Sequence, residues 1–251
     1  MNIGYIGVLA ACLLAGCVSS DGSKPRKQED PTKAAAKTNI QLGIAYLQQG
    51  NYPLAREKLE RSFKQNPKDP DVHTSLALLY DRTGDKKLAD QHFREALRLA
   101  PINPDISNNY AIYLCKNGRI DEGVARFSAA AVNKYYATPA VALTNAGVCL
   151  RDAKRLDEAQ QKFVAAIRAR PDYSEATVQL ANLHIERGQL ADARKVVDTY
   201  LGAFRPNAEV LFAAVTVARA ANDRMSEEKF SRALRLEFPE SAQARALKRG
   251  S

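Results

Sequence analysis

Histidines and cysteines are the side chains of this sequence whose chemistry could support a reaction or a covalent link. The three histidines, His73, His92 and His184, are dispersed along the chain. The sequence contains no metal-ligand cluster, Gly-rich phosphate loop or nucleophile motif. We therefore interpret the histidines as structural or surface residues, and we expect no enzymatic activity, no catalytic residue, no metal and no cofactor.

Cys17 has the clearest chemical context of the four cysteines. It ends the tetrapeptide Leu14-Ala15-Gly16-Cys17, which resembles the bacterial lipobox, where a peptidase cuts before a cysteine whose thiol carries diacylglycerol. The apolar run before it, from Ile3 to Leu14, is shorter than the roughly 20 residues that cross a bilayer. We predict that residues 1–16 are a lipoprotein signal peptide and that acylated Cys17 inserts into lipid. No Lys or Arg precedes the run, and the alternative is an ordinary secretory signal with an incidental cysteine.

The residues after Cys17 indicate the compartment. In bacterial lipoproteins an Asp directly after the lipidated cysteine commonly favours retention in the inner membrane, but Val18 occupies that place here. We therefore expect a lipid-anchored protein on the periplasmic face of the outer membrane. Residues 17–35 are rich in Ser, Lys, Asp and Pro, and we predict a flexible tether with a reach of roughly 25 Å.

Cys115 and Cys149 are the two cysteines left for the periplasmic part, since Cys12 lies in the signal peptide. An even pair in an oxidising compartment favours a disulfide, and the alternative is two separate buried thiols. A bridge requires Cα atoms within about 7 Å of each other.

A pattern with a period of about 34 residues runs through residues 36–251 and is typical of tetratricopeptide repeats. Small residues at positions eight and twenty of each unit let two helices approach, and Phe or Leu at position twenty-four fills the space between neighbours. Pro at position thirty-two ends the second helix. We predict an all-α fold, a right-handed superhelical solenoid of about six helix pairs. The expected units are 36–69, 70–103, 104–139, 140–173, 174–207 and a degenerate 208–239, followed by a C-terminal cap at 240–251.

The first helices of such units generally line a concave surface that binds other proteins. In the first unit this surface would carry Ile40, Ile44 and Leu47, which we predict as the main partner site. It would continue into a more polar stretch with Leu78, Asn108 and Ile112. Such a groove would suit an amphipathic helix or an extended peptide. The alternative is that a preceding segment covers the apolar stripe.

Two asparagines, Asn109 and Asn145, occupy position six of their repeats. Their amides could bind the backbone of a bound peptide, or they could tie one helix to the next. Cys115 and Cys149 lie on the first helices of adjacent units, so a bridge would lock the third repeat onto the fourth.

The chain has 37 Lys and Arg against 28 Asp and Glu, a formal charge of +9. The expected compartment argues against nucleic acid as the partner. Anionic lipid headgroups or an acidic stretch of a partner protein are the alternatives to a merely basic surface. We expect the protein to be monomeric by itself.

A set of residues between Asn108 and Cys149 is more specific than the repeat consensus. It comprises Asn108-Asn109-Tyr110-Ala111, Tyr113-Leu114-Cys115, Gly118-Arg119, Asp121-Glu122, Phe127, Tyr136-Ala137-Thr138-Pro139 and Asn145-Ala146-Gly147-Val148-Cys149. Together with the lipobox, this set resembles the PilF/PilW lipoproteins of type IV pilus biogenesis. The resemblance implies a pilotin, which helps the secretin subunit PilQ reach the outer membrane and assemble into the pore for the pilus. It also implies that Cys17 is the anchor, that Cys115 and Cys149 are bridged, and that a partner groove lies in the first repeats.

Two other functions are compatible with a lipobox followed by repeats. The chain could be a scaffold for peptidoglycan hydrolases or a subunit of the β-barrel assembly machinery. The proteins that co-purify with it would distinguish these possibilities from a pilotin.

Overall fold

The computed structural model describes residues 30–249, and within that range the secondary structure consists of thirteen helices and no strands. The helices are α1 (Pro31–Gln48), α2 (Tyr52–Gln65), α3 (Pro70–Thr83), α4 (Lys86–Leu99), α5 (Pro104–Lys116), α6 (Ile120–Ala131), α7 (Pro139–Asp152), α8 (Leu156–Ala169), α9 (Ser174–Glu186), α10 (Leu190–Ala203), α11 (Ala208–Ala220), α12 (Arg224–Glu237) and α13 (Ala242–Arg249). The predicted all-α repeat array is confirmed.

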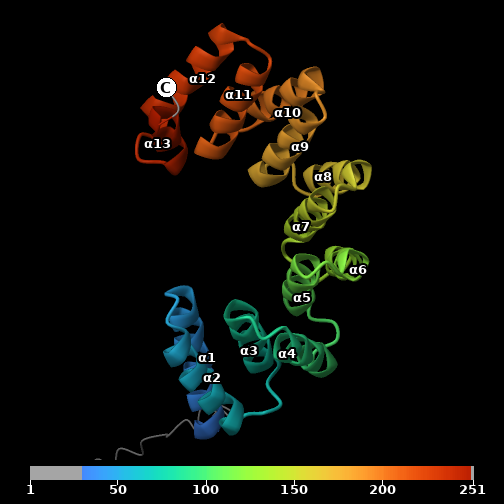
Figure 1. Cartoon of the computed structure of the whole chain (residues 1–251), viewed down its shortest axis with the longest axis vertical. Coiled ribbons are helices and arrows are strands. Elements are labelled where there is room, and N and C mark those ends of the chain that lie inside the picture. Colours follow the sequence, from blue (N-terminus) through green and yellow to red (C-terminus); the bar gives the residue numbers. More distant parts are fainter. Residues whose placement is uncertain (1–29, 250–251) are drawn as a thin grey trace, which may run out of the picture.

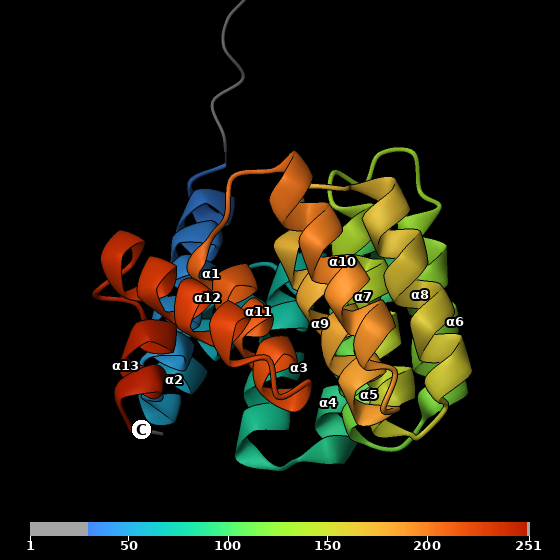
Figure 2. The same ribbon diagram turned by 90° about the horizontal axis from the view of Figure 1, so that it is seen from above.

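The helices pack as six antiparallel pairs, and α13 packs on α11 and α12 at the C-terminal end. The first helix of each pair also contacts the first helix of the next pair. In Figure 1 the pairs follow a C-shaped path, with α3, α5, α7 and α9 on its inside and α4, α6, α8 and α10 on its outside. Figure 2 shows that the two ends of the array lie on the same side of the molecule. The first helices therefore form a continuous inner face.

The turn between the two helices of a pair has the same conformation in all six repeats. Position fifteen has a positive φ in each of them, a conformation that glycine adopts without a steric penalty. The residues there are Gly50, Gly84, Gly118, Lys154, Gly188 and Asn222. The sixth repeat keeps this turn, so the unit that the sequence pattern marks as degenerate is a complete helix pair.

Small residues are required where the two helices of a pair cross. A Cβ atom on Gly147 would lie 2.4 Å from the ring of Phe163, and one on Gly43 would lie 2.6 Å from Leu59. Both large partners occupy position twenty-four and are fully buried. The close approach of the helices therefore depends on the same positions that define the repeat.

The first helix begins earlier than the sequence composition indicates. We predicted a tether through residue 35, but α1 starts at Pro31 because the Asp30 side chain accepts a hydrogen bond from the Thr32 amide at 2.9 Å. Ala36 is fully buried, and its carbonyl accepts a bond from the Ser62 hydroxyl of α2 at 2.9 Å. Residues 1–29, including Cys17 and the predicted signal peptide, lie outside the described residues. Between residues 30 and 249, no helix is long and apolar enough to span a membrane.

Candidate functional site: the inner face of the repeat array

The predicted partner site in the first repeat is more closed than the sequence indicates. Ile40 is 6% exposed and packs in the core with Leu59 and Val72, so a partner has no access to it. Position five is also buried at the equivalent Thr74 and Thr144, whereas the equivalent Asn108 is half-buried. Ile40 is therefore corrected from a surface residue to a core residue.

The other apolar residues predicted at this end are partly buried. Ile44, Leu47 and Leu78 pack against the core and keep some exposed surface. Sequence reasoning missed Leu42, which is 42% exposed. Leu42 occupies position seven, and the equivalent Leu76 of the second unit is buried. Among the described helices, α1 is contacted by α2 and α3 alone, so nothing covers Leu42. The N-terminal end of the inner face thus offers a shallow apolar surface rather than an open groove.

A deeper depression lies between α5 and α7, and we call it the disulfide hollow. It has a volume of about 530 Å³. Ile112, which is 46% exposed, contributes an apolar wall. The other lining residues are Cys115, Lys116, Ile120, Phe127, Asn145, Val148, Cys149, Asp152 and Ala153. The structure therefore gathers four of the predicted site residues, Ile112, Cys115, Asn145 and Cys149, in one place.

Two of the predicted asparagines meet beside the disulfide hollow. The Asn145 Nδ2 donates a hydrogen bond to the Asn108 Oδ1 at 3.2 Å, which ties α7 to α5. Among the described residues, the remaining amide nitrogen of Asn108 and the remaining oxygen of Asn145 have no hydrogen-bond partner. The Asn108 Nδ2 and the Asn145 Oδ1 are therefore available to the backbone of a bound peptide. Asn109 is half-buried and takes no part in this pair.

The floor of the hollow is a disulfide between Cys115 and Cys149. Their Sγ atoms are 2.03 Å apart and their Cα atoms 5.7 Å apart, within the 7 Å limit expected from sequence. Gly123 of α6 makes room for the bridge, since a Cβ atom there would lie 2.5 Å from the Cys115 Sγ. The link joins the first helices of the third and fourth repeats beneath the apolar wall.

Two of the three histidines form a partly buried pair within the second repeat, where its two helices border the first repeat. The His73 Nε2 donates to the Pro67 carbonyl at 3.0 Å, so the His73 Nδ1 of a neutral ring accepts from the His92 Nδ1 at 3.0 Å. His92 stacks on Tyr80 with ring centroids 5.5 Å apart. Burial, reinforced by the nearby His73, lowers the pKa of His92 to about 4. Both rings are fixed by packing and hydrogen bonds, and their role is structural.

We expect acid to lower the stability of the fold at pH values at which His92 in the folded protein is still neutral. An unfolded histidine titrates near pH 6.5, whereas folded His92 stays neutral down to about pH 4. The unfolded chain therefore gains a proton first, and the free energy of unfolding should fall between these values, by about 2 kcal/mol after allowance for partial exposure. Urea unfolding of wild type and His92→Gln at pH 7 and pH 4.5 measures this loss, which should be smaller in the variant. Equal losses in the two proteins would contradict the assignment.

A second polar cluster joins the second and third repeats. The Tyr110 hydroxyl donates to the Asp90 Oδ1 at 2.7 Å, and the Arg119 Nη1 donates to the same oxygen at 2.6 Å. Burial opposes the charge of Asp90, but the bonds from Tyr110 and Arg119 and the charge of Arg94 outweigh it and lower the pKa of this carboxyl. The cluster therefore links the second repeat to the third. Among the described residues, no group of three or more His, Cys, Asp or Glu side chains could hold a metal ion.

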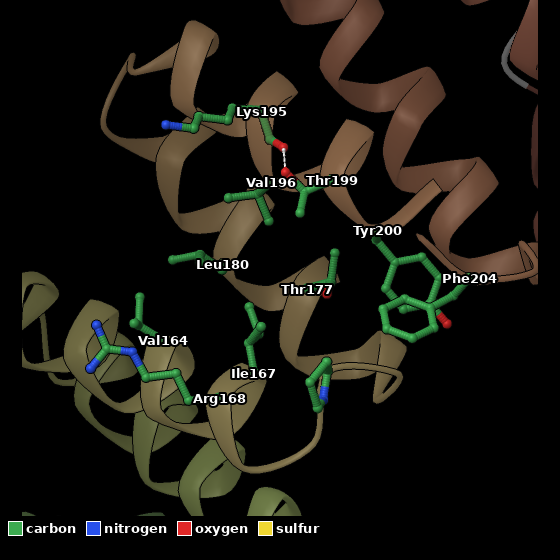
Figure 3. A pocket seen from close by; sticks show the side chains of 11 residues that line it. Val164, Ile167, Arg168, Thr177, Leu180, Lys195, Val196, Thr199, Tyr200 and Phe204 are labelled. Atoms are coloured by element: carbon green, nitrogen blue, oxygen red, sulfur yellow. Dashed lines mark hydrogen bonds between the residues drawn. The ribbon is translucent and has the colours of Figure 1, made fainter. Parts of the chain in front are cut away.

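The outer face carries an apolar pocket that sequence reasoning missed. Figure 3 shows side chains of α8, α9 and α10 converging on a cavity of about 270 Å³, with Arg168 and Lys195 at its edge. Val164, Ile167 and Val196 supply much of its wall. The sequence contained a signal for this pocket: Val164 and Ile167 are apolar residues of a second helix at positions where the repeat consensus requires no apolar side chain.

Comparison with known proteins places the repeats in a family. Tetratricopeptide-repeat models match residues 40–105 and 110–174, and a further tetratricopeptide-repeat model matches residues 150–215. The type IV pilus assembly protein PilF of Pseudomonas aeruginosa is 27% identical over 233 residues, which are 93% of this chain and 92% of that protein. An uncharacterised protein of Haemophilus influenzae is 27% identical over 154 residues, 61% of this chain and 83% of that protein.

Solved structures agree with this relation. The structure of Pseudomonas aeruginosa PilF has a TM-score of 0.65 at 24% identity and covers 88% of this chain and all of that chain. The structure of PilW, described as a widely conserved type IV pilus biogenesis factor, has a TM-score of 0.64 at 26% identity and covers 84% of this chain and 97% of that chain.

Proposed function

Since this chain belongs to the tetratricopeptide-repeat family, and since it is related in sequence and fold to the type IV pilus assembly proteins PilF and PilW, we propose that it is a pilotin. In this proposal it is a non-enzymatic lipoprotein of the outer membrane. It binds a secretin subunit on its inner face and promotes the arrival and multimerisation of the secretin at that membrane. The observation that carries the proposal is the relation to PilF over 93% of the chain.

The inner face has the chemistry that such an adaptor needs. The disulfide hollow offers an apolar wall at Ile112 and Val148, and beside it the Asn108 Nδ2 and the Asn145 Oδ1 are available for hydrogen bonds. An apolar side chain of a secretin segment would occupy the hollow while its backbone bonds to the two amides. The bridge beneath fixes the spacing of α5 and α7, so little ordering would be required on binding.

The proposed anchor explains how a binding protein becomes an assembly factor. Acylated Cys17 would hold the array at the outer membrane, and each bound secretin subunit would be confined to the same surface. Confinement raises the effective concentration of subunits and favours their association without any new contact.

Exchange of Ile112 for glutamate tests the groove. Ile112→Glu puts a charge into the apolar wall, and because the side chain is already 46% exposed the repeat should stay folded. Loss of a central apolar contact of about 2 kcal/mol corresponds to roughly 30-fold weaker binding. Affinity purification from detergent-solubilised membranes, with quantification of the secretin, measures the effect. The matched control is Leu236→Glu on α12, which is 74% exposed and lies away from the hollow.

Two outcomes would contradict the proposal. Equal recovery of secretin by Ile112→Glu and wild type would place the interface elsewhere. Recovery of a peptidoglycan hydrolase or a barrel insertase, with no secretin, would replace the pilotin assignment by a scaffold function.

A further inference from the structure

Three exposed apolar side chains gather where two connections between repeats meet. Ile102, Val132 and Tyr135 are 76%, 84% and 75% exposed. The Asn133 Nδ2 donates a hydrogen bond to the Ile102 carbonyl at 2.8 Å, and the Asn133 Oδ1 accepts one from the Tyr135 amide at 2.9 Å. Asn133 thus joins the two loops and brings the backbone of Ile102 next to the loop that carries Val132 and Tyr135. We call these three residues and Lys134 the loop patch.

The loop patch stands on the longest connection of the array. Seven residues separate α6 from α7, whereas four separate each of the other successive pairs and four separate α12 from α13. Val132 and Tyr135 both lie on this connection and are exposed to solvent. Exposed apolar side chains that are clustered and held in place usually mark a contact surface.

The position of the loop patch identifies what it would contact. Consecutive helices are antiparallel, so every connection between repeats lies on the edge of the array where the chain enters α1 (Figure 2). Asp30, at that edge, is thirteen residues after Cys17, a separation that spans at most about 45 Å of chain. The turns within repeats lie on the opposite edge, about 20 Å further away along helices of fourteen residues. The edge with the loop patch is therefore the edge that the chain from the proposed anchor at Cys17 reaches first.

The side chains of the patch suit a phospholipid surface. Tyrosine is enriched at membrane interfaces, where its ring lies among the headgroups, and aliphatic side chains enter the acyl boundary. The Lys134 Nζ lies 4.9 Å from the centre of the Tyr135 ring and has no carboxylate partner among the described residues. It is therefore free to attract a lipid phosphate.

We propose that the loop patch is a membrane-contact surface, by which the array lies with one edge against anionic phospholipid. This inference rests on the lipid anchor of the proposed function, because the anchor brings the array to the membrane by the edge on which the loop patch lies. Contact at the patch would fix the orientation of the inner face relative to the membrane, which an anchor on a tether alone does not do.

The chain contains no tryptophan, so a single introduced tryptophan reports its own surroundings. The full-length lipidated chain with Tyr135→Trp is reconstituted in vesicles of phosphatidylethanolamine and phosphatidylglycerol whose acyl chains are brominated. We expect a blue shift and about twofold quenching of tryptophan fluorescence relative to unbrominated vesicles. Met225→Trp is the matched control, since Met225 is 86% exposed beside the turn of the sixth repeat, on the opposite edge, and should show neither effect. Adding Lys134→Glu to Tyr135→Trp should reduce the quenching.

The result separates this inference from the proposed function. If both variants are in the vesicles but the tryptophan of Tyr135→Trp is quenched no more than that of Met225→Trp, the membrane contact is refuted and the patch belongs to a protein partner. If neither variant associates with the vesicles, the lipid anchor itself is refuted, and the orientation inferred from it is refuted too.

Discussion

The Cys17→Ala variant is expected to leave the outer membrane, with its repeats folded, and to lower the amount of secretin multimer there by about tenfold or more. Each acyl methylene in the bilayer contributes about 0.8 kcal/mol, and stable attachment takes two acyl chains. Replacing the cysteine removes both chains at once. Fractionation of cell envelopes, with quantification of the protein and of secretin multimers, measures the loss. Circular dichroism of the purified variant should show an unchanged helical signal.

The matched control is Cys12→Ala. Cys12 lies within the predicted signal peptide, so its replacement also removes a thiol but leaves lipidation at Cys17 possible. Membrane attachment and secretin multimers should both persist in this variant. If Cys17→Ala leaves the outer membrane while secretin multimers there stay at the wild-type level, the anchor has no part in assembly and the proposed mechanism is wrong.

The 34-residue period was sufficient to predict the helix pairs, because each repeated position has one physical task. Glycine or alanine at position eight allows the helices to cross, as Gly147 shows, and the turn at position fifteen takes a positive φ even where the residue is Lys154 or Asn222. The start of α1 was missed although its signal was present. Asp30 followed by Pro31 is a helix N-cap and first turn, but the polar composition of the segment favoured a tether.

The binding surface was less predictable than the repeats. A position in a repeat specifies which side of a helix a residue occupies, whereas exposure depends on how closely the next repeat packs against that side. Ile44, Leu78 and Ile112 all occupy position nine, yet Ile44 and Leu78 pack against the core whereas Ile112 is 46% exposed. The loop patch depends on one hydrogen bond between two connections, from Asn133 to the Ile102 carbonyl. Such contacts between distant residues have no periodic signature.

Replacement of both Cys115 and Cys149 by serine is expected to lower the free energy of unfolding by about 4 kcal/mol, since closing a loop of this length limits the unfolded chain. The two residues are 34 positions apart, one repeat length. Stability in a repeat array is transmitted between neighbours, so the loss should be concentrated at the junction of α5 and α7. Denaturant unfolding measures the total, and hydrogen exchange of the α5 to α8 amides locates it.

The same change should alter the binding site as well as the stability. Without the bridge, α5 and α7 lose the link that sets the width of the disulfide hollow, so a secretin segment would have to order the hollow as it binds. Secretin recovery should then fall in the double variant even at temperatures where the array is fully folded. Reductant provides the control: it should weaken wild type to the level of the double variant and leave the double variant unchanged. If wild type is unaffected by reductant, and a maleimide labels both cysteines in the folded protein, the bridge has no role in the stability or the binding of this protein.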